Sequence, residues 1–142
     1  MWMDPSQPPQ ESTCVTTITS AMGGRFVRNE THGSMMGMDG KPMAFEGAGL
    51  CGYNNTTGKF EMNWTDNMGT MQMNFTGGLS SDHKTLTTTS QFFCPMMHKN
   101  TWMREVETRT GPNSMTLEMF GPNMMDGKEM KVMEIQYTRR SR

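Results

Sequence analysis

The chain has 142 residues, with 13 Lys and Arg against 14 Asp and Glu, for a formal net charge of −1 at pH 7. This length is typical of one domain, and we expect residues 1–142 to form a single one. The near-neutral charge provides no field to attract nucleic acid, and no apolar run approaches the ~20 residues of a membrane-spanning helix.

The chain is rich in strand patterns and poor in helix patterns. Segments such as Phe60-Met62-Trp64 and Met133-Ile135-Tyr137 alternate large apolar residues with polar ones. Alternation with a period of two is typical of strands that have one dry face and one wet face. In chain order, we expect strands at about 11–20, 25–34, 43–53, 59–66, 70–79, 85–94, 101–110, 114–121 and 128–138. Met1–Met3 is typical of the end of an earlier strand, so the first strand is expected to be truncated at the N-terminus.

The expected connections are short and contain Gly, Asn, Asp or Pro, which favours pairing of each strand with the next. Closure into a barrel would remove exposed strand edges. The sequence therefore predicts an all-β fold, an antiparallel up-and-down β-barrel of nine or ten strands. Gly47 and Gly49 fall inside a strand and are expected to mark a bulge or a bend.

Motifs along almost the whole chain resemble those of one family. They include Trp2-Met3-Asp4-Pro5, Gly52-Tyr53-Asn54-Asn55, Trp64-Thr65-Asp66-Asn67-Met68-Gly69-Thr70 and Met133-Glu134-Ile135-Gln136-Tyr137-Thr138-Arg139. The chain resembles the bacterial family catalogued as domain of unknown function 1579, which is similar to calycins and lipocalins. This resemblance implies a lipocalin-like barrel and no established activity. Where the family commonly has a plain turn, this chain has Cys94-Pro95-Met96-Met97-His98.

Methionine is the unusual component. There are 20 Met, whereas Leu, Ile and Val together number only ten. In an up-and-down sheet alternate loops share one end, and most loop methionines fall in such a set. We call this set the Met-rich rim; it comprises Met3, Met35, Met36, Met38, Met68, Met96, Met97, Met124 and Met125, with Met43 just inside it.

Three hypotheses account for the methionines beyond the filling of a core. The first is a soft-metal site, because thioether, thiolate and imidazole groups select Cu(I) and Ag(I) over harder cations. Its candidate ligands are Cys94, Met96, Met97, His98, Met35, Met36 and Met38. Copper is the metal that this set suggests. A haem with Met or His as axial ligand is a weaker alternative.

The second hypothesis is a small apolar ligand in the barrel lumen, because Met and aromatic side chains form adaptable apolar pockets. Its candidate lining residues are Trp64, Met62, Met71, Met73, Phe75, Met119 and Tyr137. The third is a protein interface at the rim, in a larger assembly or a homodimer, because exposed apolar patches mark interaction sites. These three hypotheses remain open at this point.

No catalytic signature is present, so we expect a binding protein and not an enzyme. Ser81-Asp82-His83 contains the residue types of a hydrolase triad, but adjacent residues of one turn do not assemble such a site. Asp66 and Glu105 are expected to form structural ion pairs with Arg104 and Arg139. As written the chain is expected to be soluble and cytoplasmic. Removal of an N-terminal leader would instead place it in the periplasm or outside the cell.

Overall fold

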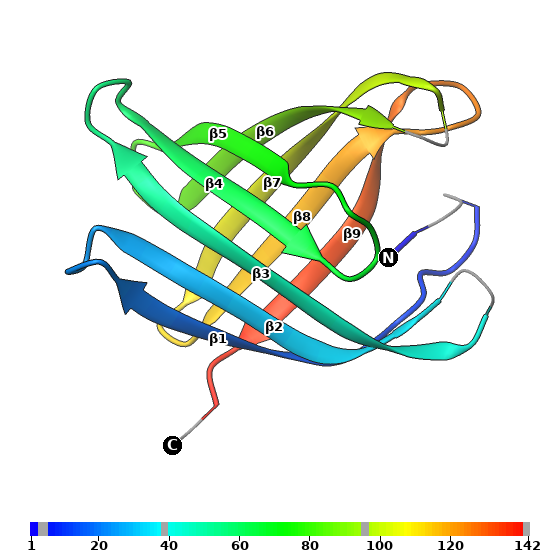
Figure 1. Cartoon of the computed structure of the whole chain (residues 1–142), viewed down its shortest axis with the longest axis horizontal. Helices are drawn as coiled ribbons and strands as arrows, with labels where there is room; N and C mark the ends of the chain where they lie inside the picture. The colour runs from blue at the N-terminus through cyan, green and yellow to red at the C-terminus, as the bar shows by residue number, and fades with distance from the viewer. Residues whose placement is uncertain (3–5, 38–39, 95–96, 141–142) are drawn as a thin grey trace. The chain divides into compact units, whose positions relative to one another are not determined.

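Nine strands follow one another in the sheet in the order in which they occur in the chain (Figure 1). The computed structural model describes residues 1–2, 6–37, 40–94 and 97–140. The strands are β1 (Cys14–Ala21), β2 (Phe26–Met36), β3 (Pro42–Asn54), β4 (Lys59–Asp66), β5 (Met73–Leu79), β6 (Thr85–Cys94), β7 (Lys99–Gly111), β8 (Ser114–Pro122) and β9 (Glu129–Thr138). Pairing is antiparallel from β1 to β4 and from β6 to β9. The predicted all-β class and up-and-down order are confirmed, whereas closure into a barrel stays a prediction.

Two strands begin later than the sequence suggests. The first begins at Cys14 and not near residue 11, and the fifth begins at Met73 and not near residue 70. After β4 the Asp66 carboxylate accepts a hydrogen bond from the backbone N–H of Met68 at 3.0 Å, which holds the turn at residues 66–68.

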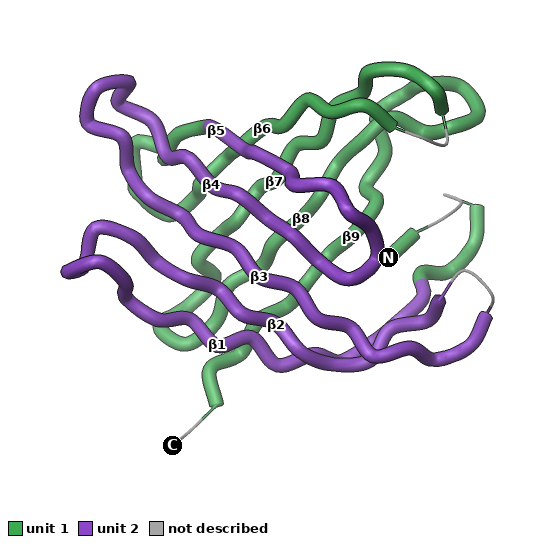
Figure 2. The backbone as a smooth tube through the Cα atoms, in the orientation of Figure 1, with its two compact units in different colours: residues 1–9, 77–142 green, residues 10–76 purple. Residues whose placement is uncertain are grey.

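The chain forms two compact units (Figure 2). Unit 1 contains Met1–Pro9 and Gly77–Arg142, and therefore β6 to β9, whereas unit 2 contains Gln10–Thr76, and therefore β1 to β4. Strand β5 runs from one unit into the other. Because one strand is common to both, the prediction of a single domain stays a prediction.

In unit 2 the Trp64 side chain of β4 packs against two glycines of β3, Gly47 and Gly49. The Trp64 side chain lies so close to β3 that a Cβ atom on Gly47 would stand 2.3 Å from the ring, and one on Gly49 would stand 3.1 Å from it. The expected bulge is wrong, because the pairing of β3 with β4 runs through both glycines without a shift of register. Glycine is required here because the ring approaches the backbone of the strand.

Few apolar side chains are fully buried. Among the described residues Phe75 of β5, at 1% exposure, is the buried hydrophobic side chain. Trp2 lies beside β9, where its backbone N–H donates to the carbonyl of Val132 at 2.8 Å. Within the described ranges no helix is long and apolar enough to cross a membrane.

Candidate functional site

The strands of unit 1 present one face on which apolar side chains alternate in register. Residues directly opposite each other in antiparallel strands lie on the same face. Glu105 of β7, for example, faces Thr88 on β6 and Met119 on β8, which in turn faces Met133 on β9. We call this surface the β6–β9 face. Its members are Leu86, Thr88, Ser90, Phe92, Cys94, Lys99, Thr101, Met103, Glu105, Glu107, Arg109, Met115, Leu117, Met119, Met133, Ile135 and Tyr137.

The apolar members of the β6–β9 face are neither fully buried nor fully exposed. All six members on β8 and β9 are half-buried, including Met119 and Tyr137, which the sequence marks as ligand-lining residues. Leu86, Phe92 and Met103 on the neighbouring strands are also half-buried. The face is therefore an apolar surface that still has accessible area.

A strip of polar side chains crosses this apolar face. We call it the polar strip; its members are Thr88, Ser90, Thr101, Glu105 and Glu107. The first four are buried, with Ser90 at 3% and Glu105 at 7% exposure. The Thr88 hydroxyl donates to the Glu105 carboxyl across a long 3.5 Å. The Ser90 and Thr101 hydroxyl oxygens have no hydrogen-bond partner among the described residues.

The pKa values of both acids in the polar strip, Glu105 and Glu107, are raised. Burial raises the pKa of Glu105 to about 7, and the charge of Glu107 raises it too, whereas the Thr88 hydroxyl acts in the opposite direction. Burial also raises the pKa of Glu107. Near neutral pH, Glu105 therefore exists both as a neutral acid and as a carboxylate.

The ion pairs of unit 1 lie on the opposite side of these strands. Arg104 is adjacent to Glu105 in β7, so its side chain points to the other face, where it pairs with Glu129 at 2.6 Å and stacks on the Phe120 ring. Lys131 bonds to Glu118 and Glu134 on that side. The expected pairing of Glu105 with Arg104 is therefore wrong.

In unit 2 the lining residues predicted from the sequence lie in pairs on β4 and β5, with one exception. Met62 and Trp64 alternate along β4, and both are half-buried. Met73 and Phe75 alternate along β5, with Met73 half-buried and Phe75 buried. Met71 lies before β5 and is 40% exposed.

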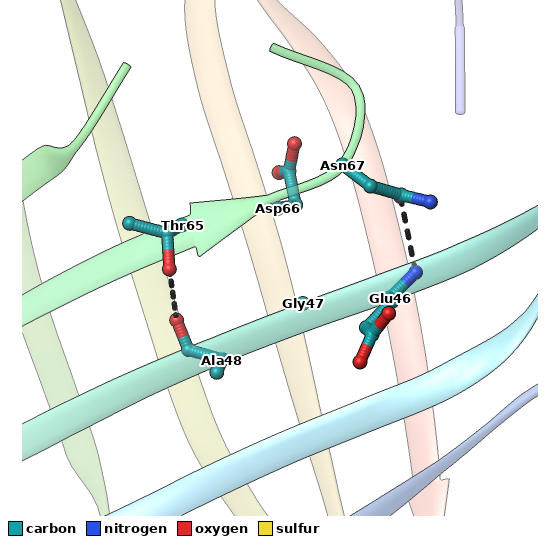
Figure 3. A pocket seen from close by; sticks show the side chains of 6 residues that line it. All are labelled: Glu46, Gly47, Ala48, Thr65, Asp66 and Asn67. Carbon is teal, nitrogen blue, oxygen red and sulfur yellow. Dashed lines mark hydrogen bonds between the residues drawn. The ribbon is translucent and has the colours of Figure 1, made fainter. Parts of the chain in front are cut away.

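A shallow pocket of about 260 Å³ lies where β3 and β4 meet (Figure 3). Its lining residues are Glu46, Gly47, Ala48, Thr65, Asp66 and Asn67. The Asn67 side chain accepts from the Glu46 backbone N–H at 3.1 Å and donates to the Ala44 carbonyl at 2.9 Å. Asp66, which was expected to pair with Arg104 or Arg139, instead accepts the Trp64 indole N–H at 2.9 Å. Because these polar groups are engaged in holding the strand ends together, we assign the pocket a structural role.

The sequence model of one family, described as "Protein of unknown function (DUF1579)", matches residues 1–139. The chain belongs to the DUF1579 family. None of the curated proteins compared with the chain matches it, and no solved structure does.

In this DUF1579 protein the proposed metal ligands are only partly placed. Met38 and Met96 lie outside the described residues. Cys94 is half-buried on the β6–β9 face opposite Lys99, and His98 is exposed in the turn beside it with a φ of 49°. Met35 and Met36 are consecutive in β2 of unit 2, so their side chains point to opposite faces. No cluster of three or more His, Cys, Asp or Glu residues suited to a metal occurs in the described ranges.

The Met-rich rim of the DUF1579 chain is exposed in part. Met36 and Met68 are exposed, as are Met124 and Met125, the last at 90%. Met35, Met43 and Met97 are half-buried, and Met3 also lies outside the described residues.

Sequence reasoning missed the polar strip, although two signals for it were present. In β6 the Thr-rich segment Thr85–Ser90 places hydroxyl groups at positions where an alternating strand would have apolar ones. In β7 the sequence Arg104-Glu105-Val106-Glu107 alternates two acids onto a single face. Both signals require knowledge of which face of each strand is buried.

Proposed function

We propose that this protein is a non-enzymatic binding module that holds a small, largely apolar molecule on the β6–β9 face. The observation that carries this proposal is the accessible apolar surface of that face. A chain of 142 residues is long enough to bury a sizeable core. Its methionine, leucine, isoleucine and tyrosine side chains on β8 and β9 nevertheless stay half-buried. A bound apolar molecule would remove this area from water, at about 25 cal/mol for each Å².

The composition of the face supports a ligand of adaptable shape. Met103, Met115, Met119 and Met133 are unbranched and polarisable, and such side chains adjust to irregular apolar surfaces. A few convergent polar groups in an apolar surface are typical of small-molecule sites, where they fix the orientation of the ligand. The polar strip provides such groups.

Binding is proposed in place of catalysis because of where the histidines lie. His32 is on β2, whereas His83 and His98 are in turns, and all three are exposed. None belongs to the β6–β9 face. The side chain that most often acts as a general base near neutral pH is therefore not at the site.

We expect the neutral fluorescent probe N-phenyl-1-naphthylamine to bind this face, and Met119→Gln to weaken its binding. Replacing a half-buried thioether by an amide should cost about 1 kcal/mol of binding free energy, or roughly a fivefold increase in Kd. The measurement is a fluorescence titration, with a thermal melt of each variant to establish that it is folded.

Met125→Gln is the matched control, because Met125 is 90% exposed and lies outside the face. It should bind the probe as the native chain does. Equal weakening in both variants, or no probe binding at all, would contradict the proposed function.

A soft-metal site at the β6–β7 turn is a second candidate function. The direct pairing of Cys94 with Lys99 favours it, since the turn between them holds Met97 and His98 next to the cysteine. Thiolate, thioether and imidazole groups within one turn are the donors that prefer Cu(I) and Ag(I).

The double substitution of Cys94 and His98 by Ala should weaken Ag(I) binding more than about tenfold, as measured by anaerobic competition titration. Cys14→Ala is the control, because Cys14 is also a half-buried thiol but lies on β1. If the double variant keeps its affinity for silver, the exposed methionines of the rim are better explained as a protein interface.

A further inference from the structure

Glu105 and Glu107 are neighbouring acids on the β6–β9 face, and neither forms an ion pair among the described residues. Glu105 and Glu107 are two residues apart in β7, so both side chains project from the same face. Their cross-strand neighbours are Thr88 and Leu86 on β6 and Met119 and Leu117 on β8. None of these neighbours is basic, and no ion pair to either acid occurs among the described residues.

The basic residues near these strands either pair with other acids or are exposed. Arg104 and Lys131 pair with other acids on the opposite side of the sheet. Lys99 and Arg109 share the face with the two acids but are exposed near the two ends of β7, and the Arg109 side chain donates to the Gly111 carbonyl at 3.3 Å. Among the described residues, therefore, no basic side chain forms an ion pair with Glu105 or Glu107.

A second and independent observation points to a ligand on the same face. Ser90 is 3% exposed and Thr101 is 9% exposed, and the hydroxyl oxygen of each lacks a hydrogen-bond partner in the described part of the chain. Ser90 is next to Thr88 along this face of β6 and is opposite Met103, whereas Thr101 is on the same face of β7 with Met103 between it and Glu105. A buried hydroxyl without a partner destabilises the folded protein, because it has lost its hydrogen bonds to water. Such groups are rare unless something else satisfies them.

We propose that the ligand of the β6–β9 face is a lipophilic amine, with its ammonium group between the carboxyl groups of Glu105 and Glu107. Its hydrocarbon part would lie on Met103, Leu117 and Met119. This assignment rests on the proposed function, and it names the chemical class of the ligand.

The chemistry of the polar strip distinguishes an amine from other amphiphiles. A carboxylate only accepts hydrogen bonds, and an ammonium group donates up to three and carries the missing positive charge. A fatty acid would add a third acid to a site that already holds two. A neutral alcohol could form a hydrogen bond with a hydroxyl group of the polar strip. It would not neutralise the negative charges of Glu105 and Glu107.

The test compares octylamine, octanol and octanoate, which share one chain and differ in the head group. Isothermal titration at pH 8 should show octylamine binding at least about tenfold more tightly than octanol, because a hydrogen bond to a charged group contributes about 1.5–3 kcal/mol. Octanoate should bind more weakly than octanol. In Glu105→Gln and in Glu107→Gln, the amine should lose most of its advantage.

Glu118→Gln is the matched control, because it removes one acid from the opposite side of the same sheet. It should leave the preference for the amine unchanged. If it weakens amine binding as much as Glu105→Gln does, a general surface charge is responsible and the inference is overturned. If the three compounds bind equally well, the inference fails and the proposed function stands. If none binds and the fluorescent probe does not bind, both fail.

Discussion

Glu105→Gln is expected to stabilise the ligand-free protein above pH 7. Burial raises the pKa of this carboxyl from 4.5 to about 7. Between these two values the unfolded chain has released the proton while the folded chain retains it, so the native protein loses stability as pH rises through this range. At about 1.4 kcal/mol for each pH unit, the loss amounts to about 3 kcal/mol by pH 8. Glutamine resembles the neutral acid and cannot ionise, so the variant avoids this loss.

The measurement is the free energy of urea unfolding of both chains at pH 4 and at pH 8. The two chains should be nearly equal at pH 4 and differ by up to about 3 kcal/mol at pH 8. Glu134→Gln is the control, because the hydrogen bond from Lys131 lowers the pKa of Glu134 and gives a small effect of opposite sign. A native chain as stable as Glu105→Gln at pH 8 would show that Glu105 is hydrated or paired, which contradicts the buried polar strip.

Gly77→Ala is expected to cause a large loss of stability. A Cβ atom at Gly77 would stand 1.8 Å from the carbonyl oxygen of Thr87 and 2.7 Å from the Cα of Thr88. These are backbone atoms of β6, which cannot move away as a flexible side chain does. The strands would have to separate, at a cost of about 3 kcal/mol or more in the free energy of unfolding.

The adjacent glycine provides the control. A Cβ atom at Gly78 meets nothing within 4 Å, so Gly78→Ala should change stability by less than about 1 kcal/mol and in the favourable direction. Thermal or urea unfolding of the two variants tests this directly. Equal stabilities would show that Gly77 does not lie against β6 as described, and would also place Thr88 in doubt.

The sequence alone predicts most of the fold because alternation is a local signal. Phe60-Met62-Trp64 marks β4, and Met133-Ile135-Tyr137 marks β9. The connections between them contain the residues that turns require. The start of β5 could not be predicted, because Met71 and Met73 continue one alternating pattern although the strand begins only at Met73.

The candidate site was less predictable, since it depends on which face of each strand is buried. The sequence predicts ion pairs of Asp66 and Glu105 with Arg104 and Arg139, but alternation sends Arg104 and Glu105 to opposite faces of β7. Ser90 and Thr101 are far apart in the chain, and only the register of β6 with β7 places both hydroxyls on one face. For the metal hypothesis, Met38 and Met96 lie outside the described residues, and the metal-ligand set stays a prediction.

The most direct test of the central claim uses the methionines themselves as reporters. With ¹³C-labelled methionine methyl groups, each of the 20 Met residues gives an NMR signal. During titration with octylamine, the signals of Met103, Met119 and Met133 on the β6–β9 face should shift in a saturable manner. The signals of the exposed Met22 and Met125 should not. Shifts confined to the exposed methionines, or equal shifts at all of them, would contradict a ligand site on this face.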